Sequence, residues 1–221
     1  SRVTTKTPTG VEMYADAIVR AMLPAISESH HEIRLYTRDS LPKDLFVPAN
    51  VRIKRIRCWR LWTQIGLSLE MLFHKIDVLF IPAHVLPLVR PKKSIVTIHD
   101  LAFMRFPEAY SKFARWYLQW STKYAVKHAL KLIVPSQATA DDLQQFFHCP
   151  AEKIVVIPHG FHTPETPSRD FIAGLLDKLH LHDPYIIFVG RLETKKNLHR
   201  LVEAFATFRT THSEWKLVLV G

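Results

Sequence analysis

Four short apolar runs, each ended by a proline or a polar turn residue, constrain the fold of this chain more than any other feature. They are DVLFIP (77–82), SIVTIHD (94–100), KLIVPS (131–136) and KIVVIPHG (153–160). Each run is rich in Val and Ile, and its apolar residues are continuous instead of alternating with polar ones. Strands of this kind are buried on both faces, which requires a parallel sheet with helices on each side.

Helices are expected between several of these strands, at about 110–130 and 137–147. The segment GVEMYADAIVRAMLPAI has apolar residues at spacings of three and four, which predicts an amphipathic helix that opens just after Gly10. Another helix is expected at 61–75, while HEIRLYT and NVRIKRIR are expected to be strands. This alternation is typical of an open α/β fold.

After Gly160 the sequence becomes polar and contains several prolines, in FHTPETPSRD, which indicates a linker. The elements expected beyond it are a helix at 168–179, a strand at 185–190, a helix at 197–211 and a strand at 216–221. In a doubly wound fold a strand precedes the first helix, yet none precedes Gly10 here, and the last unit holds only two strands. We therefore expect a fragment trimmed at both ends.

The net charge of the chain is +10, from 30 Lys and Arg against 20 Asp and Glu. This charge suggests nucleic acid, an anionic membrane or phosphorylated small molecules as partners, without choosing among them. The two cysteines, Cys58 and Cys149, lie in no C-x-x-C spacing, so we interpret them as reduced thiols. No apolar signal segment begins the chain, and IDVLFIPAHVLPLV is too short to span a bilayer. We expect a cytoplasmic protein.

Polar residues and glycines follow the expected strands, at the edge where open α/β sheets bind their ligands. They are His99–Asp100, Pro135–Ser136, Pro158–His159–Gly160 and Gly190–Arg191. Helix capping alone explains Ser136, and we interpret His159–Gly160 as a turn. His99 has two explanations, a bond to a neighbouring loop or a contact with a ligand. Scarce glycines in loops indicate tight backbone geometry, and Gly10, Gly160 and Gly190 are the examples.

Two cations, Arg191 and Lys196, flank a helix start in IIFVGRLETKKN. Solvated surface charge is one explanation. However, Arg191 directly leaves an expected buried strand, and Lys196 lies where helix N–H groups are unpaired. Together these groups make an anion site suited to a diphosphate. The chain contains no G-x-G-x-x-G or G-x-x-x-x-G-K-[ST] sequence, so this is neither a dinucleotide fingerprint nor a P-loop.

At this point the residues resemble a known family. FVGRLETKKNLHRLVEAF is similar to the start of the second domain of family 4 glycosyltransferases, which have the GT-B fold. SIVTIHDLAFMRFPEAY, KLIVPSQATADDL, KIVVIPHGF and TPTGVEMYADAIVRAM resemble successive parts of the first domain, and the likeness spans essentially the whole chain. It implies two Rossmann-like domains facing each other across a cleft. The first domain binds the acceptor and the second binds the nucleotide-sugar donor.

On this resemblance the chain has three parts. They are an acceptor-side Rossmann-like domain with a parallel sheet but without its first strand (1–163), a linker and connecting helix (164–184), and the beginning of the donor-binding domain (185–221). The E-x7-E element with which the family contacts the donor's sugar and ribose is absent from the chain. We therefore expect this chain to be inactive alone.

The resemblance also implies roles for single residues. Arg191 and Lys196 would hold the donor's diphosphate and neutralise charge on the leaving group, with Gly190 beside them as a substrate-binding residue. His99 would contact the transferred sugar or the reacting centre. Two further substrate-binding residues are Gly10, which would let the backbone approach the phosphate, and Asp100, which would shape the loop or the acceptor site.

The reaction of the family retains the anomeric configuration. The expected donor is a nucleotide-diphosphate sugar and the expected acceptor a glycan or lipid-linked molecule, and TIHDLAFMRFPE leans toward mannosyltransferases. No cofactor or metal is expected, since HHEIR is not H-E-x-x-H and no ordered ligand cluster occurs.

A basic, aromatic segment at 110–130 has two explanations. Phe113, Trp116, Trp120 and Tyr124 form one stripe of the expected helix, with basic residues mostly elsewhere. The stripe either packs on the sheet or contacts an anionic membrane at its inner face. The same segment motivates an alternative function, a non-enzymatic basic module that binds nucleic acid or anionic membrane. For an enzyme of the family, nucleic acid is not an expected partner.

Overall fold

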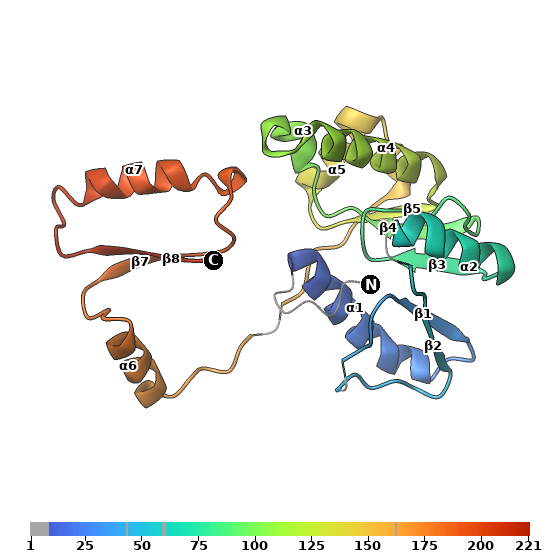
Figure 1. Cartoon of the computed structure of the whole chain (residues 1–221), viewed down its shortest axis with the longest axis horizontal. Helices are drawn as coiled ribbons and strands as arrows, with labels where there is room; N and C mark the ends of the chain where they lie inside the picture. Colours follow the sequence, from blue (N-terminus) through green and yellow to red (C-terminus); the bar gives the residue numbers. More distant parts are fainter. Residues whose placement is uncertain (1–8, 43, 59–60, 162) are drawn as a thin grey trace. The chain divides into compact units, whose positions relative to one another are not determined.

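A computed structural model shows how the chain folds (Figure 1). It describes residues 9–42, 44–58, 61–161 and 163–221. These residues form two compact units, the first ending at Gly160 and the second beginning at Phe161. Both units are α/β with parallel strands, as predicted.

Unit 1 begins with a long helix and then alternates strands with helices. Its described helices are α1 (Gly10–Ser27), α2 (Ser68–Phe73), α3 (Ala102–Arg105), α4 (Lys112–His128) and α5 (Gln137–Phe147), with short turns η1 (Trp62–Leu67), η2 (Pro107–Ala109) and η3 (Ala151–Lys153). Its described strands are β1 (Ile33–Thr37), β2 (Val51–Arg55), β3 (Val78–Ile81), β4 (Lys93–Thr97), β5 (Lys131–Val134) and β6 (Ile154–Val156). The expected helix at 61–75 is divided into the π-helical η1 and the α-helical α2.

The described strands of unit 1 form two sheets, where the sequence suggested one. The larger sheet has the order β3-β4-β5-β6 and is parallel throughout, and β1 pairs with β2, also in parallel. Within the described residues, no strand pairs with both sheets and joins them. Because the chain returns to the same end of the sheet before each strand, all four carboxyl ends of β3 to β6 lie at one edge.

The core of unit 1 lies around β4 and β5. Val96, Leu132 and Val134 are fully buried, and Leu143 of α5 and Ala125 of α4 belong to the same cluster. The prediction of strands buried on both faces is correct for β4 and β5 but wrong for β6, whose residues are only partly buried or exposed. β6 pairs with β5 alone and lies at the edge of the sheet, where the helices cover it less completely.

The aromatic stripe of helix α4 faces outward at Phe113 and Trp116, whereas Tyr124 packs against the core. The side chains of Phe113 and Trp116 are 74% and 59% exposed, so the interpretation that the whole stripe packs on the sheet is wrong. The buried face of α4 consists instead of smaller side chains, Ser121, Thr122, Ala125 and Val126. Small side chains let a helix approach a sheet closely, and this explains which face turns inward.

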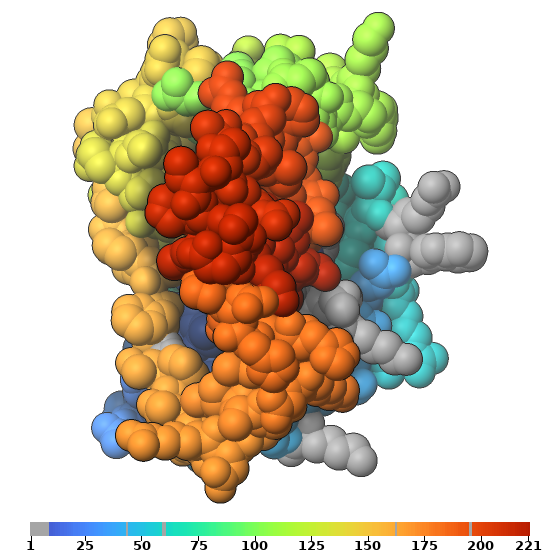
Figure 2. Space-filling view, turned by 90° about the vertical axis from the view of Figure 1, so that its left-hand side faces the viewer, coloured from blue at the N-terminus to red at the C-terminus, as the bar shows by residue number. Residues whose placement is uncertain are grey.

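Unit 2 contains α6 (Arg169–Lys178), β7 (Tyr185–Val189), η4 (Thr194–Lys196), α7 (Leu198–Phe208) and β8 (Lys216–Val220). β7 pairs with β8 in parallel, and this pair lies between α7 and α6 in Figure 1. Figure 2 shows the orange surface of α6 below the red surface of β8. The expectation that residues 185–190 form a buried strand is wrong, because the side chain of Val189 is 71% exposed. The described helices and strands of unit 2 leave most residues of β7 exposed.

Candidate functional site

Three histidines meet at the carboxyl edge of the larger sheet. His84 follows β3, His99 follows β4 and His159 follows β6, and parallel strands bring these positions to one edge. The ring centroids of His99 and His159 are 5.3 Å apart, and those of His84 and His99 are 5.5 Å apart. This is the edge at which open α/β sheets bind ligands.

Both ring nitrogens of His99 have partners. Nε2 lies 3.1 Å from the carbonyl oxygen of Pro82, which only accepts, so Nε2 carries a hydrogen and donates it. Nδ1 lies 3.3 Å from Nε2 of His159. Burial lowers the pKa of His99, and the Pro82 carbonyl opposes this shift only in part. His99 is therefore a neutral ring at pH 7, with its lone pair on Nδ1.

The loop that carries His99 is held by side chains as well as by the strand. The amide of His99 donates to Nε2 of His84 over 3.0 Å. The carboxylate of Asp100 accepts from the amide of Ala102 over 3.0 Å, at the start of α3. This hydrogen bond joins Asp100 to the start of α3. The two roles expected for Asp100, in the loop or in the acceptor site, remain predictions.

Helix α1 brings Tyr14 to the same edge. The ring centroid of Tyr14 lies 4.9 Å from that of His99 and 4.6 Å from that of His159, and its hydroxyl is 3.4 Å from Oγ1 of Thr97. The carboxylate of Glu12 accepts from the amide of Thr9 over 2.7 Å, which orders the first turn of α1. The amino terminus of α1 therefore belongs to the site.

Gly10 is the first residue of α1 and is exposed. A Cβ atom added at Gly10 or at Gly160 would meet no described atom within 4 Å, so tight packing requires glycine at neither position. The prediction of tight backbone geometry from scarce loop glycines is therefore not supported by packing at Gly10 or Gly160. The open space at Gly10 leaves room for a ligand, and the approach of a phosphate to this residue remains a prediction.

Sequence reasoning missed three residues of this edge. His159 was interpreted as part of a turn, His84 was not considered, and Tyr14 was counted only among the apolar residues of its helix. One signal was available for His159, because it directly follows the fourth apolar run. No local pattern indicated Tyr14, since its spacing is also that of an ordinary core residue.

The loop between β7 and α7 in unit 2 carries the second set of predicted residues. Gly190 has φ of 151° and its amide donates to the carbonyl of Val220 over 2.8 Å. A Cβ atom added at Gly221 would come within 2.5 Å of the carbonyl oxygen of Gly190. Gly190 is therefore favoured by its positive φ, and Gly221 by its close approach to the Gly190 carbonyl.

Arg191 and Lys196 lie on this loop, as predicted, with Lys196 in η4 just before α7. The guanidinium of Arg191 forms an ion pair with the carboxylate of Glu193 over 2.8 Å, and its side chain is 64% exposed. The α7 cap is Asn197, with φ of 56°. An anion that binds Arg191 must therefore compete with Glu193, and binding of a diphosphate by these cations remains a prediction.

Replacing Gly190 by Ala should destabilise unit 2. A side chain at φ of 151° costs about 1–3 kcal/mol, so hydrogen exchange of the β7 and β8 amides should become faster. The matched control is Gly174→Ala inside α6, where an added Cβ meets open space. That change should stabilise the helix by about 1 kcal/mol. Unchanged exchange in Gly190→Ala would contradict the assigned backbone strain.

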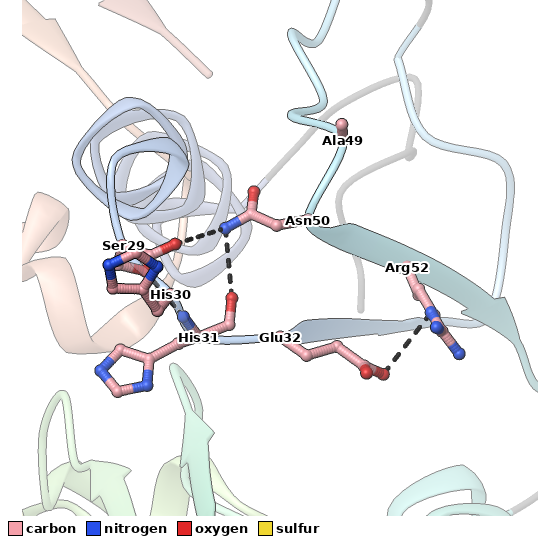
Figure 3. Close-up of a pocket in the computed structure, with 7 residues that line it drawn as sticks. All are labelled: Ser29, His30, His31, Glu32, Ala49, Asn50 and Arg52. Carbon is pink, nitrogen blue, oxygen red and sulfur yellow. Dashed lines mark hydrogen bonds and ion pairs between the residues drawn. The ribbon is translucent and has the colours of Figure 1, made fainter.

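A depression of about 280 Å³ lies away from this edge, where α1 ends and β1 and β2 begin (Figure 3). Its centre is Asn50, whose side-chain amide donates to the carbonyl of Ile26 over 3.0 Å and to that of His31 over 3.1 Å. Arg52 and Glu32 pair at its rim over 3.6 Å. These contacts tie α1 to the smaller sheet, so we interpret the depression as structural.

The described residues contain neither a metal-binding cluster nor a membrane-spanning helix. No group of three or more His, Cys, Asp or Glu side chains in the described part of the chain could hold a metal ion. Among the described helices, none has both the length and the hydrophobicity of a membrane span.

The chain matches two sequence models of known families. The model described as Glycosyltransferase Family 4 matches residues 8–164, which is more than half of the chain. The model described as Glycosyl transferases group 1 matches residues 177–221. The two matches follow one another in the order of the two units.

Curated relatives point to the same kind of enzyme. The chain is 23% identical over 137 residues to O-antigen chain mannosyltransferase B of Escherichia coli, a match that covers 60% of this chain and 35% of that protein. It is 34% identical over 95 residues to lipopolysaccharide 1,2-N-acetylglucosaminetransferase of Salmonella typhimurium, which covers 41% of this chain and 24% of that protein. The matches thus span about a third or less of these relatives.

A solved structure shares the fold. HepE of Anabaena, crystallised in complex with UDP and glucose, superposes with a TM-score of 0.63 at 17% identity. The superposition covers 98% of this chain and 58% of that one. The predicted GT-B-like architecture of Rossmann-like units is thereby confirmed.

Proposed function

The chain belongs to glycosyltransferase family 4, and from this premise we propose that the whole protein moves a sugar from a nucleotide-diphosphate donor to a glycan or lipid-linked acceptor. The observation that carries the proposal is the ordered pair of family matches, residues 8–164 followed by 177–221. An enzyme of this kind would hold the acceptor on the first domain and the donor on the second, and the two matches correspond to the first domain and the start of the second.

Electrostatic stabilisation of the leaving diphosphate is the main task in the proposed mechanism. Arg191 and Lys196 would supply positive charge to the phosphates as the sugar–oxygen bond breaks, assisted by the free N–H groups at the start of α7. The carboxylate of Glu193 forms an ion pair with the guanidinium of Arg191. A diphosphate, with more charge than one carboxylate, is suited to replace it.

His99 would act on the sugar as a neutral ring. Burial lowers its pKa, and its two nitrogens are bonded to Pro82 and His159, so the transferred sugar would contact the edge or face of an uncharged imidazole. A neutral imidazole suits a reaction in which an oxocarbenium-like sugar develops positive charge, because an imidazolium would repel it. We propose that transfer retains the anomeric configuration.

The relatives support a hexose donor but differ in the sugar. One is named for mannose and the other for N-acetylglucosamine, and HepE was crystallised with glucose. We propose mannose first, because the mannosyltransferase match covers the larger share of this chain, 60% against 41%. The comparisons do not favour the alternative of a non-enzymatic basic module.

Turnover of nucleotide sugars by the whole protein tests the proposal. Purified protein is incubated with GDP-mannose, UDP-N-acetylglucosamine or UDP-glucose, with and without EDTA, and release of nucleoside diphosphate is measured. One donor should be turned over well above the others, and EDTA should have no effect if no metal is needed. No release from any donor, with or without acceptor lipid extracts, would contradict the function.

We also propose peripheral contact with an anionic membrane through α4. Phe113 and Trp116 are exposed on this helix, and its exposed lysines are Lys112, Lys123 and Lys127. Aromatic side chains enter the lipid interface while lysines attract anionic headgroups. The membrane would bring a lipid-linked acceptor close to unit 1.

Co-sedimentation with vesicles tests this contact. Vesicles of mixed phosphatidylcholine and anionic phosphatidylserine should carry down more protein than vesicles of phosphatidylcholine alone. The double change Phe113→Ser and Trp116→Ser should weaken binding by about tenfold or more. Phe171→Ser on α6, another exposed aromatic, is the matched control. Equal sedimentation of the α4 variant and the control would contradict the assignment of α4.

A further inference from the structure

We propose that His159 is a positioning residue that holds the His99 ring in one orientation and in one tautomer. The sugar-binding purpose of His99 rests on the proposed function, whereas the contact between the two rings does not. No residue of the loop after β6 was assigned a role by the sequence motifs.

The direction of the hydrogen bond follows from the groups around His99. Nε2–H of His99 donates to the carbonyl of Pro82, so the neutral ring has no hydrogen on Nδ1. Nε2 of His159 lies 3.3 Å from that Nδ1 and must therefore be the donor. This arrangement assigns a hydrogen to Nε2 of His159 as well.

Two opposed partners hold a ring better than one. With the Pro82 bond alone, the His99 ring could still turn about its Cβ–Cγ bond, because Nε2 lies near that axis. The contact from His159 on the opposite nitrogen removes that freedom. Loss of this freedom before a substrate arrives lowers the entropy cost of reaching a reactive geometry.

His159 is itself held, although it is exposed. The ring of Tyr14 packs against His159 with centroids 4.6 Å apart, and against His99 at 81° in an edge-to-face contact. Tyr14 belongs to α1, whose first turn is ordered by Glu12. The position of His159 therefore depends on α1 as well as on its own loop.

Among the described residues, four titratable groups face His99, and they act differently on its charge. A charge on His159 opposes protonation of His99, and that of Asp100 favours it. Nε2 of His84 accepts the His99 amide, and the Tyr14 ring contacts the imidazole through its edge. Removing His159 also exposes His99 to water. Both effects should move the midpoint of His99 titration upward, toward that of free histidine.

Nitrogen NMR of the histidine rings tests the contact in this chain without any substrate. Samples with ¹⁵N-histidine are compared for the parent chain, His159→Ala and His159→Gln, and His99→Gln identifies the His99 signals. Gln is the matched variant because its amide nitrogen can donate at the reach of His Nε2, whereas Ala has no donor.

The parent chain should show the Nε2–H tautomer at His99. In His159→Ala the Nδ1 signal should shift, because it loses its donor, and the titration midpoint should rise. His159→Gln should restore the Nδ1 shift of the parent. Identical His99 signals and midpoints in the parent chain and in His159→Ala would overturn the proposal.

Activity of the whole protein provides a second readout. His159→Ala should lower kcat by about tenfold to a hundredfold with a smaller change in KM, and His159→Gln should recover most of the loss. Equal kcat for parent and His159→Ala in an active enzyme would overturn the positioning role. If the parent transfers no sugar while the NMR differences are present, the proposed function fails and the ring contact stands.

Discussion

Replacing Arg191 and Lys196 by Ala in the whole protein should abolish measurable sugar transfer. Loss of one preorganised electrostatic group typically costs about 100- to 1,000-fold in kcat, so loss of both should cost at least about 1,000-fold. The effect should be large because both cations lie on the loop at the carboxyl end of β7, where an anion would also meet the N–H groups of α7. Release of nucleoside diphosphate at saturating donor measures it.

The control for this change is Lys178→Ala, which removes an exposed cation from the end of α6 and should leave kcat unchanged. A single change, Arg191→Lys, separates charge from geometry, because lysine keeps the charge but loses the planar fork that binds a phosphate through two bonds. The Arg191→Lys variant should retain only part of the parent's activity. Unchanged turnover in the double variant would remove both residues from the mechanism.

Replacing His99 by Ala should lower kcat of the whole protein by about 100-fold or more, with the fold unchanged. The ring lies at the end of β4 with both nitrogens bonded, so alanine removes the fixed, neutral ring that would contact the sugar. The matched control is His31→Ala, an exposed histidine that lines the depression around Asn50 (Figure 3). Equal kcat in the two variants would contradict the role of His99.

The pH dependence of the parent enzyme gives a second view of His99. A protonated His99 would point a second N–H at the donor nitrogen of His159, which breaks the contact. Burial lowers the pKa of His99, so the neutral form persists below the ordinary histidine value of about 6.5. The acid limb of kcat/KM due to this residue should therefore lie below pH 6.5. A midpoint above that value would show that another group controls the limb.

Much of the fold was predictable because its signals are local. The four apolar runs became β3 to β6, and the segment 137–147 forms a helix with those bounds, capped by Ser136 as predicted. Ser136 accepts from the amide of Thr139 over 3.2 Å, a contact that involves only neighbouring residues. Such contacts depend on sequence neighbours and not on the rest of the chain.

The candidate site was predictable only in part. Gly190, Arg191 and Lys196 were found because a strand, a turn and a helix start are consecutive in the sequence. Glu193 was not weighed as the partner of Arg191, although it lies two residues away, because an ion pair depends on side-chain geometry as well as on spacing. His99 was found from its place at a strand end, and its neutral state depends on burial that no local pattern shows.

The sequence by itself determined the α/β class, the order of the elements and the strand ends at which polar groups gather. These properties follow from hydrophobic runs and turn residues, whose effects extend over a few positions. Only the tertiary structure decided which face of α4 turns inward and that Tyr14, His84 and His159 surround His99. These residues are separated by up to 145 positions, from Tyr14 to His159. Their contacts form because parallel strands end at one edge and α1 packs beside it, which is a property of the whole fold.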